Sequence, residues 1–320
     1  MLIVRTVSEL RTALSEARRA GRRIGLVPTM GAFHEGHLSL MRRARSSCDV
    51  VVVSLFVNPR QFNESADLEH YPRDEARDAA LASEQGVDYL FAPPVSEVYP
   101  PGFATTVSVR GLTEGLEGAE RGRGHFDGVT TVVAKLLNMV GPDAAFFGQK
   151  DAQQAAVVRR MVHDLNMPVE IAVCPTVRAA DGLALSSRNV LLSASDRPRA
   201  AALHRALGAV KSAVARGEHD PERALDAGRA ELAAAGVAPD YLSLVAADTM
   251  EPVEAIGGEM LAVIAARFGP VRLIDNTPIS VGDGPEPSPT HTAQPGHGPG
   301  LDTDNEVATP ARGVNPSQEA

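Results

Sequence analysis

A buried strand that runs into a turn with two glycines and two histidines constrains this chain more than any other feature. Residues 24–27 are IGLV, residues 28–37 are PTMGAFHEGH, and an amphipathic run begins at Leu38. An apolar run followed by residues at helical spacing predicts a parallel strand that leads into a helix. An open α/β sheet binds its ligands where its strands end. We therefore expect an α/β fold whose binding site is built around residues 28–37.

The side chains of this turn suit an anionic ligand. Gly31 and Gly36 let the backbone approach a ligand, and free N–H groups at a helix start favour an anion. His34 and His37 lie three residues apart, so both imidazoles point the same way on one helical turn. Two alternatives are ordinary capping histidines and a metal site. A zincin helix needs histidines at i and i+4 and a third ligand, which is not obvious nearby, so we favour a triphosphate.

The composition is that of a chain with two folded domains. The chain has 320 residues, and 44% of them are hydrophobic, enough for real cores. Its net charge is −9, but residues 283–320 contain six acidic residues and one arginine, so the remainder carries about −4. This balance argues against a nucleic-acid partner, which needs a basic surface. Pro, Gly, Ser, Thr and charged residues dominate 283–320, and we expect this tail to be disordered.

The N-terminal residues and the lengths of the apolar runs predict neither a signal peptide nor a membrane span. The N-terminal MLIVR lacks the basic-then-apolar order of a signal peptide, and no apolar run approaches the roughly 20 residues of a membrane span. We expect a cytoplasmic protein with no membrane partner. Cys48 and Cys174 are the two cysteines. One follows an expected helix and the other an expected strand, so buried thiols are favoured over a disulfide.

Strand and helix signals alternate up to about residue 176. Thr6 and Glu9 form a capping box before a first helix. Residues 50–57 are continuous and β-branched, as a central parallel strand requires. Asp127 is expected to cap a helix that opens at residue 125. Further strands are expected at residues 89–91, 105–109, 144–147 and 169–173.

A change of pattern after residue 176 predicts a second domain. Residues 195–235 are rich in alanine and helical, with a break at residues 217–221, and three strand-like runs follow at residues 241–245, 260–266 and 271–275. Helices followed by strands indicate a separate α+β domain. We expect residues 1–176 to form a Rossmann-like parallel-sheet domain, residues 177–282 a smaller α+β lid, and residues 283–320 the tail.

Polar side chains follow two more strands. Asn58 and Gln61 come after the strand at residues 50–57, at the same sheet edge as the histidines. Amides both donate and accept, which suits a ligand with hydroxyl and carboxylate groups. Lys150 supplies a point charge for phosphate, Asp151 an acceptor for ribose hydroxyls, and Gln154 lies one turn further on. The alternative for the Lys-Asp pair is an ordinary solvated helix start.

A Ser-Ser-Arg sequence lies at the start of the second domain. Ser186 and Ser187 place two hydroxyls beside the guanidinium of Arg188, which suits a mobile anion clamp. The alternative is a serine turn that caps the helix after Ser195 and leaves Arg188 uninvolved.

Taken together, these polar segments resemble those of a known family. The histidine pair resembles the "HIGH" box of the nucleotidyltransferase superfamily, which stabilises the pentavalent α-phosphorus in adenylyl transfer, and the Ser-Ser-Arg sequence is similar in role to the "KMSKS" loop of class I synthetases. From residue 1 to about 282, in order and spacing, the chain resembles the pantoate–β-alanine ligase family. The matching segments are residues 28–37, 56–62 (FVNPRQF), 71–73 (YPR), 125–129 (HFDGV), 147–154 (FGQKDAQQ) and 185–189 (LSSRN).

The resemblance implies a two-step reaction and its partners. ATP and pantoate give pantoyl adenylate and pyrophosphate, and β-alanine then gives pantothenate and AMP. Magnesium would arrive with ATP rather than at a protein-built metal site, and a homodimer is expected. A different nucleotidyltransferase acting on another small acid, a non-catalytic nucleotide sensor and a metal hydrolase are the rival hypotheses.

The resemblance also implies roles for individual residues. Catalysis, with His37 as a proton donor, is implied for His34, His37, Lys150, Ser186, Ser187 and Arg188. ATP binding is implied for these six and for Met30, Gly31, Gly148, Asp151, Val177 and Leu185. Pantoate is implied at Gln61 and Gln154, and β-alanine at Gln61 and Asn58.

Three positions depart from the family pattern. The family usually has arginine where this chain has Gly122, flanked by Arg121 and Arg123, and the sequence does not decide which arginine reaches the site. Gln149 stands where glutamate is usual, and Leu185 where methionine is common; an amide still hydrogen-bonds and leucine keeps an apolar wall.

Overall fold

The computed structural model describes residues 1–62, 68–69 and 71–281. The chain divides into a unit that spans Met1–Gly282 and a second unit, Asp283–Ala320. The second unit is the tail for which we predict disorder, and it lies outside the described residues. The predicted loop at residues 67–73 is only partly within the described residues.

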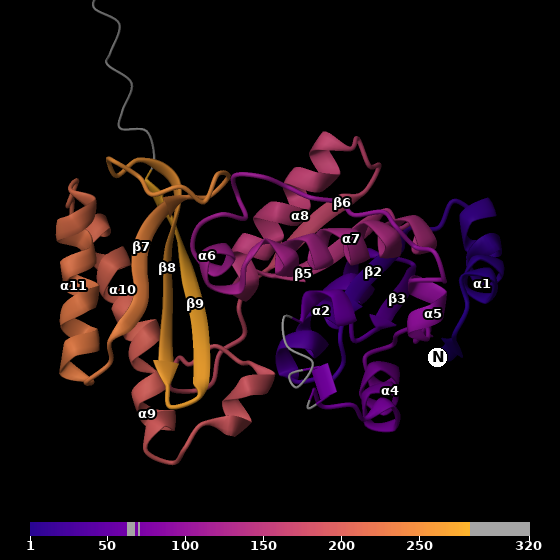
Figure 1. Ribbon diagram of the computed structural model, residues 1–320, viewed down its shortest axis with the longest axis horizontal. Coiled ribbons are helices and arrows are strands. Elements are labelled where there is room, and N and C mark those ends of the chain that lie inside the picture. The colour runs from indigo at the N-terminus through magenta and orange to yellow at the C-terminus, as the bar shows by residue number, and fades with distance from the viewer. Residues whose placement is uncertain (63–67, 70, 282–320) are drawn as a thin grey trace, which may run out of the picture. The chain divides into compact units, whose positions relative to one another are not determined.

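A parallel sheet in the order β1-β4-β3-β2-β5-β6 forms the core of the N-terminal part (Figure 1). From β2 the chain proceeds to β3 and β4 on one side and to β5 and β6 on the other, so the strand order switches between β2 and β5. A ligand site is expected at that point. The predicted Rossmann-like class is confirmed. The strands are β1 (Leu2–Val4), β2 (Ile24–Thr29), β3 (Val50–Leu55), β4 (Tyr89–Phe91), β5 (Ala144–Gly148) and β6 (Glu170–Cys174). Sequence analysis missed β1, a short edge strand whose first two residues are exposed.

Helices cover both faces of this sheet (Figure 1). Val50 and Val52 of β3 belong to one apolar core, and Val51 and Val53 to the other, because successive side chains of a strand point to opposite faces. This explains why β3 is apolar throughout. The first core includes α1 (Val7–Arg19), α7 (Arg123–Val140) and α8 (Ala152–Asp164), and the second includes α2 (Glu35–Ser47) and α4 (Glu75–Glu84). Shorter helical segments are α5 (Val95–Val98), α6 (Glu117–Arg121), η1 (Pro59–Gln61), η2 (Gln149–Asp151) and η3 (Ser187–Leu191).

The helix-start signals have mixed outcomes. Thr6 caps α1 through a capping box with Glu9, as predicted. The prediction that Asp127 caps α7 is wrong: α7 begins at Arg123, and the Asp127 carboxylate accepts a hydrogen bond of 2.6 Å from the Ser108 hydroxyl. The carboxylate therefore fastens the preceding segment to the helix instead of capping it.

The strand predicted at residues 105–109 is absent from the structure, which assigns no strand there. The Val107 N–H donates to the Thr131 hydroxyl at 3.0 Å, and the Val107 carbonyl accepts from the Thr130 hydroxyl at 2.5 Å. The segment's β-branched residues favour extended backbone, but its partners are side chains of α7 rather than another strand. Both cysteines are free and buried, as predicted.

A smaller antiparallel sheet, β7-β8-β9, forms the C-terminal domain (Figure 1). In β8, Ala262 and Ile264 belong to a core shared with the helices α10 and α11, whereas Leu261 and Val263 belong to the core of the parallel sheet. The two faces of this sheet thus join the two parts of the protein. The elements are α9 (Asp196–Ala200), α10 (Ala202–Ala215), α11 (Pro221–Ala234), β7 (Pro239–Ala246), β8 (Gly258–Phe268) and β9 (Val271–Val281). Among the described residues, no helix is long and apolar enough to span a membrane.

Candidate active site

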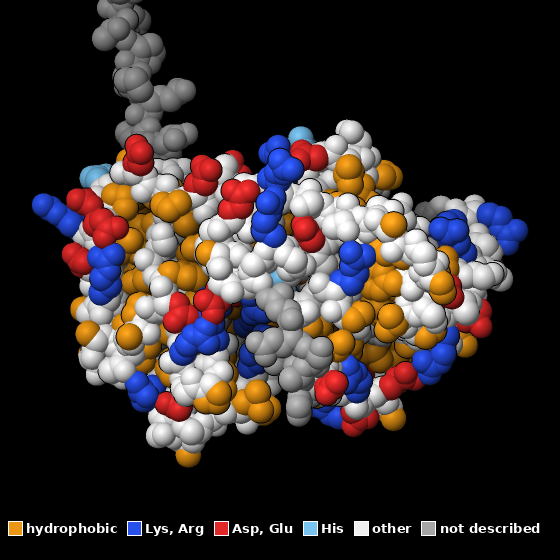
Figure 2. All heavy atoms as spheres, viewed as in Figure 1, with side chains coloured by type: hydrophobic (Ala, Val, Ile, Leu, Met, Phe, Trp, Pro, Cys, Tyr) orange, Lys and Arg blue, Asp and Glu red, His pale blue; other side chains and the backbone are white. Residues whose placement is uncertain are grey.

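A cavity of about 1080 Å³ lies where β2 and β5 end. It brings together most residues that the sequence singled out, from both domains. The predicted residues that line it are Met30, His34, His37, Gln61, Gly148, Lys150, Asp151, Gln154, Val177, Leu185, Ser186, Ser187 and Arg188. Gly31 and Asn58 do not line it. In Figure 2, basic side chains are set back in a hollow near the middle of the face shown.

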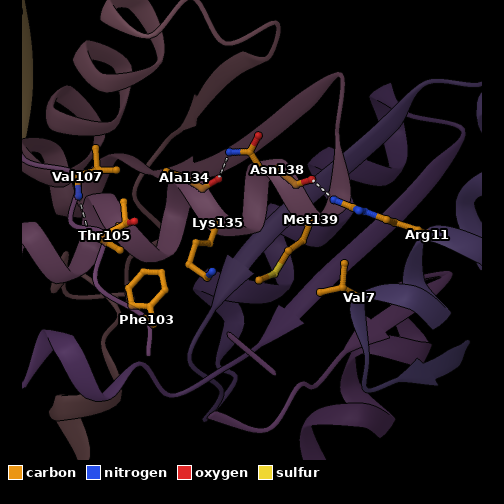
Figure 3. A pocket seen from close by; sticks show the side chains of 10 residues that line it. Val7, Arg11, Phe103, Thr105, Val107, Ala134, Lys135, Asn138 and Met139 are labelled. Carbon is orange, nitrogen blue, oxygen red and sulfur yellow. Dashed lines mark hydrogen bonds between the residues drawn. The ribbon is translucent and has the colours of Figure 1, made fainter. Parts of the chain in front are cut away.

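A second cavity, of about 460 Å³, contains none of the predicted residues. It lies between α1, α7 and the segment at residues 103–107 (Figure 3). Its cations are engaged: the Lys135 ammonium lies 4.6 Å from the centre of the Phe103 ring, and Arg11 donates to the Asn138 carbonyl at 3.3 Å. The larger cavity is therefore the candidate active site.

The two histidines face each other at the start of α2, with ring centres 4.3 Å apart. Nδ1 of His34 accepts from the Gly36 N–H at 3.1 Å, and Nδ1 of His37 accepts from the His34 N–H at 3.4 Å. In a neutral ring whose Nδ1 accepts, Nε2 carries the proton. Each histidine thus uses its Nδ1 to cap a backbone N–H, as the capping alternative expects. The Nε2–H group of each ring is left as a donor. Gly36 is required here, since a Cβ atom would lie 2.8 Å from Cε1 of His34.

Both histidines are held in the neutral form. Burial, followed by the neighbouring His34 ring, lowers the pKa of His37 to about 3. Burial, followed by the positive charge of Lys150, also lowers the pKa of His34. Near neutral pH, His37 consequently donates a hydrogen bond rather than a readily lost proton.

Two backbone N–H groups of the turn that precedes α2 are engaged inside the protein, whereas the prediction of anion binding concerns the N–H groups at the helix start itself. The N–H groups of Ala32 and Phe33 donate to the two carboxylate oxygens of Asp78, each at 2.8 Å. Gly31 and Ala32 have positive φ values of 91° and 53°, which turn successive N–H groups to one side as an anion-binding nest. A buried carboxylate of the chain itself fills this nest. These two N–H groups are therefore not available to an anion in the cavity.

The end of β5 delivers a lysine and a carboxylate to the cavity. Lys150 Nζ lies 3.4 Å from Asp151 Oδ1. Burial raises the pKa of Asp151, but the charges of Lys150, Arg121 and Arg188 outweigh it, so the pKa is lowered overall. Asp151 is therefore an ionised acceptor. Within the described residues, no group of three or more His, Cys, Asp or Glu side chains is arranged to hold a metal.

Asn58 lies behind Gln61 rather than in the cavity. Its side chain is only 1% exposed. Its amide donates to Gln61 Oε1 at 2.9 Å and to the Gly128 carbonyl at 3.0 Å, and its Oδ1 accepts from the Tyr99 hydroxyl at 2.8 Å. Every hydrogen-bonding group of this amide is engaged inside the protein. Asn58 thus orients the Gln61 side chain. The backbone carbonyl oxygen of Gln61 lies 2.9 Å from Nδ1 of His125.

Of the two candidate arginines, Arg121 lines the cavity and Arg123 does not. Arg121 Nε donates to Glu117 at 3.0 Å, and Glu117 also accepts two bonds, of 2.7 and 2.9 Å, from Arg272 of β9. Burial, followed by the charge of Arg121, lowers the pKa of Arg188. Arg121 and Arg188 thus both bring a positive charge to the lining of the cavity, that of Arg121 being paired with Glu117.

Sequence reasoning missed several contributors to this site. Tyr71 and His125 line the cavity; both lie in segments that matched the family, which was the one signal available. Asp78 gave no signal, because it lies in a polar helix, α4, and looked like a solvated residue. Its role depends on contacts 45 and 46 residues away in the sequence.

Comparisons with known proteins agree with the geometry. A family model described as pantoate-beta-alanine ligase matches residues 2–278. Pantothenate synthetase from Cereibacter sphaeroides is 58% identical over 277 residues, covering 87% of this chain and 99% of the relative. That from Heliobacterium modesticaldum is 52% identical over 282 residues, covering 88% and 100%.

Solved structures give the same result. Pantothenate synthetase from Thermus thermophilus superposes with a TM-score of 0.81 at 50% identity, covering 87% of this chain and 99% of that chain. Pantoate-beta-alanine ligase from Francisella tularensis, solved in complex with beta-gamma ATP and beta-alanine, gives 0.70 at 33% identity, covering 87% and 97%.

Proposed function

The chain belongs to the pantoate–β-alanine ligase family, and from this membership we propose how its cavity carries out the reaction. The enzyme is an AMP-forming ligase that joins pantoate to β-alanine with consumption of ATP. Another nucleotidyltransferase activity is not favoured, because curated relatives matched over nearly their whole length are pantothenate synthetases.

In the first step, a carboxylate oxygen of pantoate attacks the α-phosphorus of ATP, and the bond to pyrophosphate breaks with its electron pair. The carboxylate is its own nucleophile, so no activated Ser or Cys is needed. The step requires alignment and stabilisation of charge on the phosphoryl oxygens. We assign this to the Nε2–H groups of His34 and His37. The Nδ1 contacts and lowered pKa values of both rings support the assignment.

The cations of the cavity take the phosphate chain. Lys150 and Arg188, with Ser186 and Ser187, bind the β- and γ-phosphates and then the departing pyrophosphate, and Arg121 adds a further positive charge. Asp151 accepts from the ribose hydroxyls. In nucleotide sites, Mg²⁺ is generally held by substrate phosphates, waters and one or two carboxylates. It would therefore bind here together with ATP.

In the second step, the β-alanine amine attacks the acyl carbon of pantoyl adenylate, AMP leaves with the electron pair of the acyl–oxygen bond, and the nitrogen passes a proton to water. Gln61 and Gln154 hold pantoate through its hydroxyl and carboxylate groups, and Gln61 also lies near the amine. Met30, Gly148, Val177 and Leu185 form the nucleotide wall. Asn58 and Gly31 contribute from behind, by fixing Gln61 and the turn.

The observation that carries this proposal is the pair of histidines whose Nδ1 atoms accept backbone N–H groups, in one cavity with Lys150 and Arg188. The test is AMP formation from ATP and D-pantoate, with and without β-alanine, by the intact chain and by His37→Ala. We expect AMP release that depends on both substrates and collapses in the variant. ATP binding without pantoate-dependent AMP would contradict the ligase assignment and favour a nucleotide sensor.

Three further features belong to the proposal. The C-terminal domain, from about residue 177, acts as a lid in that its Ser-Ser-Arg loop covers the cavity, while β8 and β9 stay attached to the parallel-sheet domain. The protein functions in the cytoplasm as a homodimer. Light scattering of the protein as it elutes from a size-exclusion column is expected to give twice the mass of one chain. A monomer mass at micromolar concentration would refute the dimer.

A further inference from the structure

Two adjacent polar residues of β9, Asp275 and Asn276, are buried at the wall of the candidate site and have no role in the chemistry above. Each is 3% exposed. They pair with Ile264 and Val263 of β8, so their positions are fixed by the antiparallel sheet. Buried polar groups in a strand need partners, and these partners lie outside the sheet.

Asn276 is bonded to the turn that carries Lys150. Its Nδ2 donates to the carbonyls of Gln149 and Lys150 at 2.8 and 3.0 Å, and its Oδ1 accepts from Gln149 Nε2 at 2.9 Å. Two carbonyl acceptors fix which end of the Asn276 amide is the NH₂ group, so Gln149 must present its own NH₂. Gln149, one of the departures from the family pattern, fits this contact because an ionised glutamate has no hydrogen to donate.

Asp275 is bonded to the segment that leads into Ser186. Arg178 forms two bonds with its carboxylate, of 2.6 and 3.0 Å, and also donates to the carbonyls of Gly182 and Asn276. Arg178 and Ala184 form an antiparallel bridge that closes this turn. The chain then runs directly into Ser186–Arg188. Arg178 therefore connects the serine loop to both residues of the pair.

We propose that Asp275 and Asn276 form a positioning clasp that holds the Lys150 turn and the Ser186–Arg188 loop at a fixed separation, so that both grip one polyphosphate. The inference rests on the proposed function, since it takes these two segments to be the ATP-binding elements. Neither residue touches the reacting atoms. A displacement of about 1 Å in a catalytic group costs on the order of 100-fold in rate, so such a clasp has a large kinetic effect.

Stability alone does not explain this arrangement. A buried Arg–carboxylate pair loses much of its Coulomb energy to desolvation, and apolar residues of similar volume often replace it without loss of stability. A bidentate pair does fix geometry, because the guanidinium and the carboxylate match in only one plane. The clasp provides what phosphate binding from two domains requires, a defined distance.

The kinetic test compares Asn276→Asp with Ser280→Ala. Asn276→Asp keeps the size of the side chain but turns a carboxylate toward the two carbonyls, and Ser280→Ala removes an exposed hydrogen bond from the same strand. We expect Asn276→Asp to raise KM for ATP and to lower kcat, so that kcat/KM for ATP falls by about 100-fold. The KM for pantoate should stay within about twofold of the original value. Ser280→Ala should change neither value. An unchanged KM for ATP with a uniformly lower kcat would indicate a smaller folded fraction and overturn the clasp.

Hydrogen exchange by mass spectrometry tests the clasp without relying on activity. Asn276→Asp should speed exchange in peptides that cover residues 149–154, and Asp275→Asn should do so in peptides that cover residues 178–185, while β8 stays protected. If Asp275→Asn fails to fold because Arg178 is left unpaired, the neutral pair Asp275→Asn/Arg178→Gln replaces it. Unchanged exchange in both segments would overturn the proposal. If the original protein forms no AMP, the proposed function fails, and hydrogen exchange still decides whether the clasp exists.

Discussion

At the scale of single residues, the site depends on side chains that are held by other side chains. His37 is positioned through its Nδ1, and Gln61 is oriented by Asn58, whose amide is wholly engaged. Asp78 fills the nest formed by the turn after β2. His37 and Gln61 line the cavity, and each is held by a hydrogen bond from within the protein. Such supporting contacts give precise geometry to a site built on turns.

The first residue-scale prediction concerns the ionisation of His37. Burial lowers its pKa from 6.5 to about 3. The unfolded chain takes up a proton near pH 6.5 and the folded chain does not. His37 therefore makes the free energy of unfolding fall as the pH drops from about 6.5 to about 3, and it adds no pH dependence above that window. We expect the ring proton resonances of His37 to stay constant between pH 8 and 5.

His37→Gln serves as the control for this prediction. The variant has no imidazole to protonate, so its free energy of unfolding should fall less steeply with pH in the same window. A resonance of His37 that titrates with a midpoint near 6.5 would show that the ring is not held neutral.

The second residue-scale prediction concerns Asp78. Asp78→Asn leaves one oxygen for two N–H groups and turns an NH₂ group toward one of them. We expect a loss of about 1–3 kcal/mol in the free energy of unfolding and roughly a 10- to 100-fold loss of kcat as the histidine turn moves. Asp74→Asn is the control, since Asp74 caps the same helix and asparagine caps equally well. Equal activity of both variants would contradict a role for the nest.

At the scale of elements, close backbone packing sets the position of the pantoate glutamine. Helix α7 lies against η1 at Gly128, where a Cβ atom would lie 2.2 Å from the Arg60 carbonyl oxygen. The same glycine offers its carbonyl to Asn58. The absence of one side chain therefore allows the contact that places Gln61.

The element-scale prediction is that Gly128→Ala separates α7 from η1. Backbone atoms cannot yield as a flexible side chain does, so we expect KM for pantoate to rise at least tenfold and Tm to fall by several degrees. Gly124→Ala is the matched control, because it lies in the same helix with nothing within 4 Å of its Cβ position. Alanine favours helix there by up to about 1 kcal/mol. If KM for pantoate stays the same in Gly128→Ala, this contact does not set the substrate site.

At the scale of the whole molecule, the cavity is assembled from the two sheets. The parallel sheet supplies the ends of β2 and β5, and the C-terminal domain supplies the serine loop and β9. Apolar residues of β8 lie in both cores and join the two sheets. Figure 2 shows acidic and basic side chains interspersed over the face in view.

The whole-molecule prediction concerns residues 283–320. Within the part of the chain that the structure describes, the residues that line the cavity all precede this segment, and the family match ends at residue 278. We expect a chain that ends at residue 282 to keep kcat and both KM values within about twofold, although it loses six acidic residues and one arginine. Steady-state kinetics of the two chain lengths measures this, and a large loss of turnover would give the tail a role in the site.

The sequence by itself determined what depends on local spacing. The alternation of apolar runs and helical periods gave the α/β class, Thr6 and Glu9 gave the start of α1, and the spacing of His34 and His37 placed two imidazoles on one turn. The ordered boxes identified the family. These features are readable because neighbouring residues decide backbone conformation, periodicity and capping.

Only the tertiary structure decided which polar groups meet. It gave the nest to Asp78, turned Asn58 inward behind Gln61, tied residues 105–109 to α7 instead of a strand, chose Arg121 over Arg123, and joined Lys150 to Asn276 across 126 residues. A buried hydrogen bond depends on where two distant segments come to lie, and the local pattern around either partner carries no record of the other.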